Sequence, residues 1–127
     1  MAHNPHHEHL MTEVDELFGP LLKSSKKAIY IYLDDEHKTC NKSFSDMLGY
    51  KSVKEWVTFQ YPVSDVLEKD QKKAINAYMK ASKKFVSSKV TGTWVKKNGK
   101  KIKTEVLMVP FSYGDEVFVL HFITPVK

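Results

Sequence analysis

The chain has 127 residues, of which 42% are hydrophobic and 28% charged, a balance that fits one soluble globular domain rather than a disordered segment. A chain of this length buries roughly two thirds of the surface that its unfolded form exposes, so it needs neither a disulfide nor a metal to fold. Its only cysteine, Cys40, excludes an internal disulfide, and no apolar run approaches the ~18 residues of a membrane span. We therefore expect a cytoplasmic protein with no membrane partner.

The net charge of +5 comes from lysine alone, because the sequence contains no arginine. Arginine supplies the bidentate contacts to phosphate and guanine that sequence-specific nucleic-acid binders favour. The lysines between positions 69 and 84 instead indicate a solvated helix face, with weak, salt-sensitive binding of a polyanion as the alternative. The composition argues against a nucleic-acid partner.

Residues 1–11 form a polar leader with His3, His6, His7 and His9, and we expect this leader to be flexible. Flexible imidazoles without a framework of carboxylates or thiols capture metals only loosely. The sequence therefore predicts no metal site.

An amphipathic helix is expected over residues 12–27, opened by a capping pattern at Thr12 and broken or kinked at Gly19 and Pro20. Its apolar stripe must cover either the outer face of the chain's own sheet or the equivalent element of a second chain. The stripe consists of Val14, Leu17, Phe18, Leu21 and Leu22.

The next segment combines two short strands with a helix that has clear start and stop signals. Residues 28–33 alternate as a strand, and a polar turn leads to a second strand that ends at Asn41. Asn41 can cap a short helix, and Gly49 can take the left-handed conformation that ends it. The apolar face of that helix consists of Phe44, Met47 and Leu48.

A longer helix is predicted over residues 70–85, which contain neither glycine nor proline. The pattern then switches to the period-two alternation of strands, over residues 90–97, 101–111 and 117–124. With the two earlier strands this pattern predicts one antiparallel sheet of five strands with helices on one face, which is an α+β fold.

This order of elements resembles a PAS (Per-Arnt-Sim) sensor domain over residues 28–124. The resemblance begins with strand, turn and strand, followed by the motif N-x-x-F-x-x-x-L-G-Y at residues 41–50. It continues with Asp70 at the start of the connector helix, with K-N-G at residues 97–99 in place of a K-D-G turn, and with F-I-T at residues 122–124 in place of a closing D-I-T. We therefore take residues 28–127 as a PAS-like domain.

Two positions depart from the pattern of the family. Asn98 replaces the usual aspartate of the turn, and Phe122 replaces an acidic residue that in PAS domains often helps to link the sensor to a following effector.

The resemblance, combined with strand alternation, implies which side chains surround the position where PAS domains hold a ligand. We favour a filled or small cavity over a built-in cofactor site, because large side chains such as Trp94, Phe118 and Phe122 can fill that volume. A small apolar ligand of unknown identity is the other interpretation. The pocket candidates are Leu33, Phe44, Met47, Leu48, Ile75, Tyr78, Met79, Trp94, Ile102, Thr104, Val106, Phe118, Leu120 and Phe122.

The opposite face of the predicted sheet is also apolar, and a single broken helix is too small to cover it alone. We therefore expect a homodimer. The interface candidates are Val14, Leu17, Phe18, Leu21, Leu22, Tyr30, Tyr32, Val119 and His121.

The resemblance also allows the residues that hold cofactors in PAS domains to be compared with the residues of this chain. A flavin-binding light sensor of this family needs a cysteine after the G-Y motif and a glutamine on the last strand, whereas Cys40 precedes that motif and Leu120 occupies the strand position. A haem sensor usually takes its axial histidine from the connector helix or nearby, and residues 70–85 contain none. We therefore expect no cofactor and a colourless protein.

The sequence contains no P-loop, G-x-S-x-G or H-E-x-x-H motif, and no histidine can be placed beside Cys40, so no catalytic residue is predicted. The resemblance implies a non-enzymatic sensing and protein-interaction module that couples occupancy of its core to contacts in a dimer or with a separate signalling effector. One alternative is a purely structural dimerisation module with a filled core. A small-molecule-binding enzyme or carrier of similar shape is the more distant one.

Overall fold

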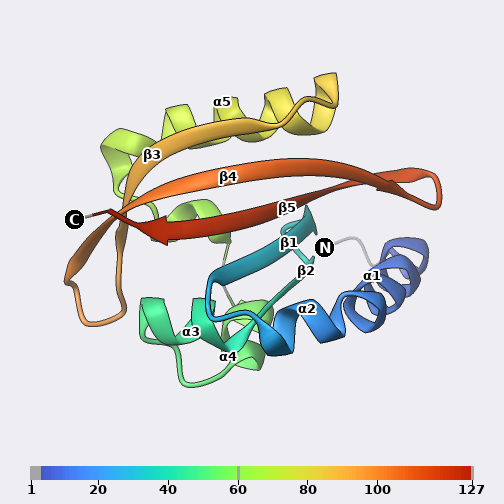
Figure 1. Cartoon of the computed structure of the whole chain (residues 1–127), viewed down its shortest axis with the longest axis horizontal. Helices are drawn as coiled ribbons and strands as arrows, with labels where there is room; N and C mark the ends of the chain where they lie inside the picture. The colour runs from blue at the N-terminus through green and yellow to red at the C-terminus, as the bar shows by residue number, and fades with distance from the viewer. Residues whose placement is uncertain (1–3, 60, 127) are drawn as a thin grey trace.

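The computed structural model describes residues 4–59 and 61–126 (Figure 1). Its helices are α1 (Pro5–Leu17), α2 (Gly19–Ser24), α3 (Lys42–Leu48), α4 (Val53–Phe59) and α5 (Glu68–Lys84), with a short 3-10 helix, η1 (Pro62–Asp65), before α5. Its strands are β1 (Ala28–Asp34), β2 (His37–Cys40), β3 (Ser88–Val95), β4 (Lys101–Tyr113) and β5 (Glu116–Pro125).

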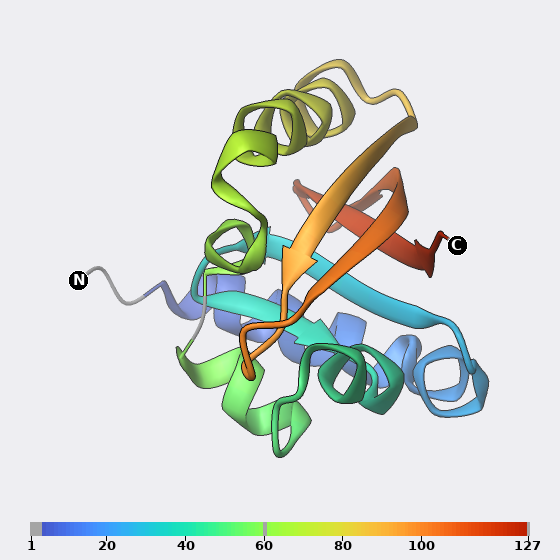
Figure 2. The same cartoon turned by 90° about the vertical axis from the view of Figure 1, so that its left-hand side faces the viewer.

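The five strands form one antiparallel sheet in the order β2-β1-β5-β4-β3. The last strand in sequence, β5, lies at the centre of the sheet between β1 and β4. Figure 2 shows β3 and β4 crossing at a steep angle to β1 and β2, because the sheet is strongly twisted. The expected α+β fold with a five-stranded antiparallel sheet is confirmed.

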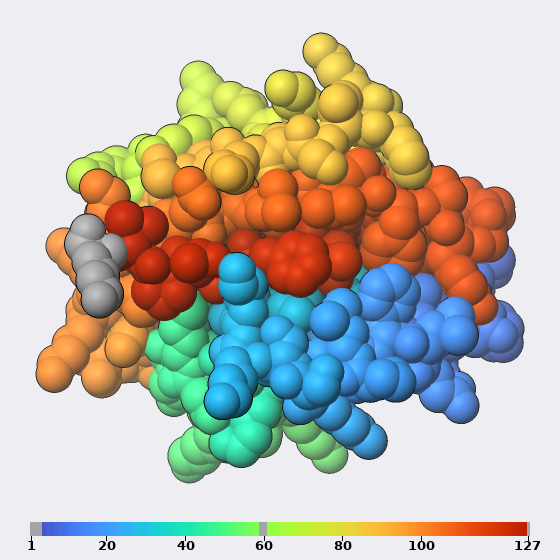
Figure 3. Space-filling model, in the orientation of Figure 1, coloured from blue at the N-terminus to red at the C-terminus, as the bar shows by residue number. Residues whose placement is uncertain are grey.

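Helices cover both faces of this sheet. The inner face, which carries Tyr30, Trp94 and Val119, packs against α3, α4 and α5. The outer face, which carries Ile31 and Phe118, packs against α1 and α2. In Figure 3 the N-terminal helices (blue) lie directly against β5 (red). The N-terminal segment therefore covers the outer face of its own sheet, which was the first of the two expected arrangements.

The N-terminal helix begins at Pro5, earlier than predicted. The side chain of Asn4 accepts a hydrogen bond from the backbone N–H of His7 (3.1 Å), and Pro5 occupies the first helical position. The prediction of a flexible leader over residues 1–11 is thus wrong from Pro5 onward, while residues 1–3 lie outside the described part of the chain. The predicted break is confirmed, because α1 ends at Leu17 and α2 begins at Gly19.

The helix predicted after the second strand is α3, with both of its signals in place. The side chain of Asn41 caps the helix by accepting from the N–H of Phe44 (3.0 Å), and Gly49 ends it with a left-handed φ of 84°. Asn41 is buried, and its side chain also accepts from the N–H of Ile29 (3.1 Å) and donates to the carbonyl of Lys27 (2.8 Å). One side chain therefore joins the entry to β1, the end of β2 and the start of α3.

The long helix α5 begins two residues before the predicted start and runs alongside β3 (Figure 1). Acidic residues in its first turn and Lys83 and Lys84 in its last turn suit the helix dipole. The carboxylate of Asp70 accepts from the backbone N–H of Thr93 (2.9 Å), which ties the start of α5 to β3. No helix in the described part of the chain is long and apolar enough to cross a membrane.

The register of β1 and β5 corrects the predicted orientation of these strands. Tyr30 lies opposite His121 and Tyr32 opposite Val119, and these pairs belong to the inner face. The intervening pairs lie on the outer face, together with Leu33 and Phe118. Both strands are buried on both sides, so their apolar pattern has no polar face from which the phase of the alternation could be read.

Candidate functional site

A cavity of about 300 Å³ lies between the inner face of the sheet and helix α5. It is bordered by the segment of η1 and by Val66, which forms an isolated bridge with Trp94 of β3. Its lining is mostly aromatic and aliphatic. The lining residues are Tyr30, Tyr32, Asp35, Pro62, Val63, Val66, Asp70, Ala74, Ile75, Tyr78, Met79, Val90, Thr91, Gly92, Trp94, Val106, Met108 and His121.

Helix α5 covers this pocket. The residues that the helix contributes to the lining recur at helical spacing, so they share one face. Ala74 and Tyr78 lie one turn apart, as do Ile75 and Met79. The small side chain of Ala74 leaves space below the helix. Ile75 and Met79 are 46% and 42% exposed, so these two side chains stand between the cavity and solvent.

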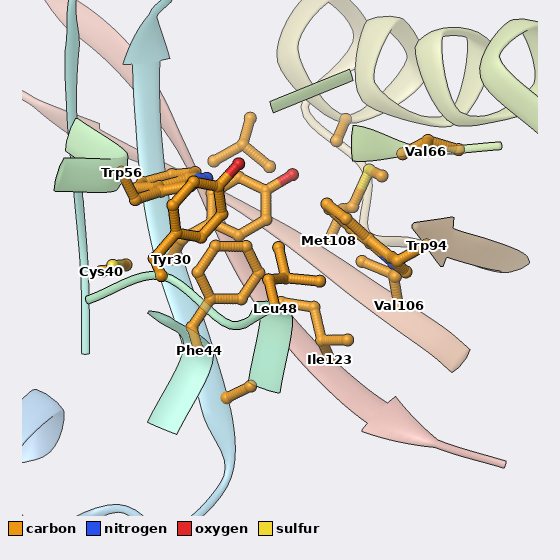
Figure 4. Packing of buried hydrophobic residues seen from close by; sticks show 14 residues of the cluster. Tyr30, Cys40, Phe44, Leu48, Trp56, Val66, Trp94, Val106, Met108 and Ile123 are labelled. Atoms are coloured by element: carbon orange, nitrogen blue, oxygen red, sulfur yellow. The ribbon is translucent and has the colours of Figure 1, made fainter. Parts of the chain in front are cut away.

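The wall of the pocket on the sheet side is built from stacked rings. The ring of Tyr30 stacks on that of His121 with centroids 3.9 Å apart and planes 12° apart. The ring of Tyr78 on α5 is also nearly parallel to His121, at 6.5 Å and 13°. Behind Tyr30 stand Phe44 and Trp56, with centroids 5.0 and 5.3 Å from it (Figure 4). These contacts hold the tyrosine in one orientation.

His121 is a neutral group at this site. Only 2% of the residue is exposed, and its Nδ1 donates to the backbone carbonyl of Val119 (3.1 Å). Burial lowers the pKa of this imidazole to about 3, so the ring carries no charge at neutral pH. The pocket therefore presents a flat, uncharged histidine rather than a cation.

Two carboxylates bring polarity to the pocket. The hydroxyl of Tyr32 donates to Asp35 (2.7 Å), and burial raises the pKa of that phenol. The hydrogen bond from the backbone of Thr93 lowers the pKa of Asp70, which stays ionised. Both carboxylates are thus oriented acceptors in a largely apolar lining.

Of the predicted pocket residues, ten lie on the inner side of the sheet. Ile75, Tyr78, Met79, Trp94 and Val106 line the cavity itself. The core packed beside it contains Phe44, Met47, Leu48 and Ile102. Thr104 is buried on β4 and donates through its hydroxyl to the carbonyl of Gly92 (3.2 Å). Contact of any of these residues with a ligand stays a prediction.

The other four pocket candidates lie on the wrong side of the sheet. Leu33, Phe118, Leu120 and Phe122 belong to the outer cluster under α1 and α2, and the two-sided burial of β1 and β5 is the cause.

Four residues assigned to the interface belong to the inner face instead. Tyr30, Tyr32 and His121 line the pocket, and Val119 is buried in the inner core. The residue types gave no signal for this exchange, because aromatic side chains with a polar tip suit an interface as well as a pocket wall.

The apolar stripe of the N-terminal helices is partly used inside the chain. Val14 and Leu22 are buried against the outer face, and Phe18 packs on Phe111 with ring centroids 5.0 Å apart. Leu17 and Leu21 remain 62% and 38% exposed.

The register of β5 brings residue 121, and not residue 120, to the pocket. Leu120, taken as the strand position next to a flavin, faces α1 and α2, and its neighbour His121 lines the pocket. Cys40 is buried in the inner core, where burial raises the pKa of its thiol to about 12 and makes it a poor nucleophile. The absence of a flavin or haem stays a prediction.

No protein-family model and no curated protein matches this chain. Solved structures do. A LOV protein from Rhodobacter sphaeroides superimposes with a TM-score of 0.74 at 14% identity, over 91% of this chain and 68% of that one. The PAS domain of a protein from Colwellia psychrerythraea has a TM-score of 0.72 at 17% identity, over 89% and 97% of the two chains.

The PAS domain of an HTR-like protein from Haloarcula marismortui has a TM-score of 0.66 at 17% identity, over 97% of this chain and 100% of that one. These similarities establish the PAS fold. Sequence identities this low show the fold alone and do not assign a ligand or a partner to this chain.

Proposed function

Starting from the PAS fold of this chain, we propose that it is a non-enzymatic sensing and interaction module that binds a small ligand under α5. The observation that carries the proposal is the cavity of about 300 Å³ with its aromatic lining and few polar groups. Ligand pockets span ~300–1,000 Å³, and such a mixture of apolar walls and a few fixed polar groups is typical of them. The volume suits a small ligand.

The lining favours a planar ligand with a hydrogen-bond donor. The rings of Tyr30, Tyr78 and His121 are nearly parallel, so a flat molecule can stack within the same set of planes. Asp35 and Asp70 supply acceptors at the pocket. A small aromatic or heteroaromatic compound with an N–H or O–H group meets both requirements.

Strand β5 offers a physical route from the pocket to the N-terminal helices. His121 lines the cavity on the inner face, while its neighbours Leu120 and Phe122 belong to the cluster under α1 and α2 on the outer face. A ligand that binds better to one position of β5 shifts the population toward that position, and the packing under the helices follows. Pocket occupancy is thereby coupled to the exposed side of α1 and α2.

The partner contact in this proposal is a homodimer formed through the exposed side of the N-terminal helices. Leu17 and Leu21 are the exposed remainder of the predicted apolar stripe. We expect a dimeric mass by light scattering at about 100 μM, well above the micromolar dissociation constants of many weak interfaces. Leu17→Lys is expected to give a monomer, while Val126→Lys, which changes another exposed apolar residue outside the N-terminal helices, leaves the dimer intact. A monomeric wild-type protein at that concentration overturns the dimer.

Ligand binding is tested by native mass spectrometry of protein purified from its own host. Ala74→Phe fills the pocket from α5, and Asn76→Phe adds the same ring at an exposed position on that helix. We expect a small-molecule adduct on the wild type and on Asn76→Phe, and none on Ala74→Phe. An adduct retained by Ala74→Phe places the ligand elsewhere and contradicts the proposal.

A purely structural dimerisation module is the second candidate. It is favoured by the solid packing of the inner core beside the pocket, where Phe44, Leu48 and Trp56 have no exposed surface. A dimer without any adduct in the same spectra supports this candidate over a sensor.

A further inference from the structure

A cluster of two histidines and an aspartate lies where α1 meets the turn between β1 and β2. His7 Nδ1 stands 2.7 Å from Asp34 Oδ2, and His37 Nδ1 stands 2.7 Å from Asp34 Oδ1. One ligand atom from each residue lies within 4.8 Å of those of the other two, and all three residues are partly buried. We propose that His7, Asp34 and His37 form a binding site for a divalent transition metal, with Zn²⁺ as the best fit, that fastens α1 to the β1–β2 hairpin.

The chemistry of the donors supports zinc or a similar ion. Imidazole nitrogen and carboxylate oxygen bind Zn²⁺ at about 2.0–2.2 Å, so donors around a tetrahedral ion stand roughly 3.3 Å apart. The hydrogen-bonded pairs, at 2.7 Å, are closer than that value, and no two of the ligand atoms are more than 4.8 Å apart. Small side-chain rotations therefore bring the three donors to coordinating distance, and water can take the fourth position.

The carboxylate of Asp34 is already held in place. Its Oδ1 accepts from the backbone N–H groups of Glu36 (2.9 Å) and His37 (2.8 Å), which fixes the side chain within the turn. Its Oδ2 is directed at His7 on the neighbouring helix. Such orientation before binding lowers the cost of organising a metal site.

A further carboxylate supports His7 from behind. The second ring nitrogen of His7, Nε2, lies 3.1 Å from Glu116 Oε2. Histidines that bind a metal through one nitrogen commonly donate the other N–H to a carboxylate, which orients the ring and increases its basicity. The fold thus supplies His7 with carboxylates from outside the leader, and the three proposed ligands are not among the residues that line the pocket under α5.

The alternative to the proposed site is metal binding by two other histidines of α1, His6 and His9. His6 lies 2.6 Å from Asp115 and belongs to a more exposed group with Asp115 and Glu116, while His9 is exposed and stands near Glu13 on its own helix. Loose capture of metal by the helix surface would depend on these two histidines. The proposed site depends on His37, which is on a different element.

The test is calorimetric titration of ZnCl₂ into the metal-free full chain. We expect one saturable site per chain, at least tenfold weaker in His7→Gln and in His37→Gln. The supporting carboxylate predicts a loss of about tenfold in Glu116→Gln. His6→Gln and His9→Gln, as matched controls, are expected to bind like the wild type. The absence of saturable binding, or an equal loss in His6→Gln or His9→Gln, overturns the proposal.

A second measurement separates loss of the site from loss of the fold. Co²⁺ in place of Zn²⁺ gives visible absorption bands that report its coordination, and we expect these bands from the wild type and not from His37→Gln. The circular dichroism spectra of both metal-free proteins are expected to coincide. Identical cobalt spectra for the two proteins contradict the participation of His37.

Discussion

The two faces of the sheet are both apolar, yet they are packed in different ways. On the outer face, Ile29, Ile31 and Phe118 have no exposed surface, and α1 and α2 close over them. On the inner face, α5 covers a cavity whose wall includes polar-tipped rings such as Tyr30 and His121. The same strands supply both faces.

The difference between the faces follows from the shapes of the side chains. Branched aliphatic residues and the stacked pair of Phe111 and Phe118, with centroids 5.4 Å apart, fill the space under the N-terminal helices. Under α5, flat rings and the small Ala74 meet without filling the volume. We infer that the outer face mainly stabilises the fold, whereas the inner face combines stability with space for a ligand.

The largest effect is expected from removal of residues 1–23. This deletion uncovers the outer face, including Ile31, Phe118 and Leu120, and an apolar surface of this kind drives aggregation. Light scattering should show large aggregates or no soluble protein. Removal of residues 1–3, which keeps the Asn4 cap, serves as the control and should behave like the wild type. A soluble truncation with an unchanged unfolding midpoint would show that the outer face needs no cover.

The second-largest effect is expected from truncating one large side chain on each face to alanine. Phe118→Ala and Trp94→Ala should each lower the free energy of unfolding by about 3–5 kcal/mol, because both side chains are buried. Phe118 is enclosed on all sides, whereas Trp94 borders an existing cavity, so Phe118→Ala should cost more. Urea denaturation followed by circular dichroism measures both values. An equal or reversed order would show that the two faces are packed equally well.

The free energy of unfolding should depend on pH through His121 on the inner face. The pKa of His121 is lowered from 6.5 to about 3 in the folded chain, so below pH 6.5 the unfolded chain binds a proton that the folded chain does not. Stability is therefore lost as the pH falls from 6.5 towards 3, by at most about 1.4 kcal/mol per pH unit. Tyr30 and Tyr78 face this ring and stay protonated, because burial raises the pKa of both phenols.

The matched variant for this dependence is His121→Phe, which keeps an aromatic ring and removes the titration. Its free energy of unfolding, measured by urea denaturation over the same pH range, should fall less steeply than that of the wild type. Parallel curves for the two proteins would show that His121 contributes nothing to acid sensitivity.

The smallest effect is expected at the rim of the pocket. Tyr32→Phe removes the hydrogen bond to Asp35 and should lower stability by about 0.5–1 kcal/mol, since this bond is partly open to water. Thermal denaturation resolves the change when it is compared with Tyr61→Phe, which alters an exposed tyrosine. An equally large loss of stability in Tyr61→Phe would show that the Tyr32 hydroxyl contributes no more to stability than an exposed hydroxyl does.

Much of the fold could be predicted because its signals are local. The cap at Asn41, the left-handed Gly49 and the break at Gly19 each act through neighbouring residues, and each lies where the sequence predicted it. The start of α1 has a local signal too, because Asn4 and Pro5 form a capping pattern ahead of the one predicted at Thr12.

The candidate site could be predicted only in part. Residues of α5 and of β3 and β4, such as Tyr78, Trp94 and Val106, have polar neighbours that reveal which side is buried, and the structure places them at the pocket. In β1 and β5 the odd-numbered and the even-numbered residues are equally apolar, so alternation alone does not show which set faces the pocket. The prediction placed Leu120 at the pocket and His121 on the outer face, and the structure has the reverse.

The sequence by itself determined which segments become helices and strands, because capping, turns and periodicity depend on residues a few positions apart. Only the tertiary structure decided which side of β1 and β5 faces α5, because a strand buried on both sides acquires its orientation from the elements that pack on it. The same holds for the cluster of His7, Asp34 and His37, whose members meet only when α1 lies across the β1–β2 turn.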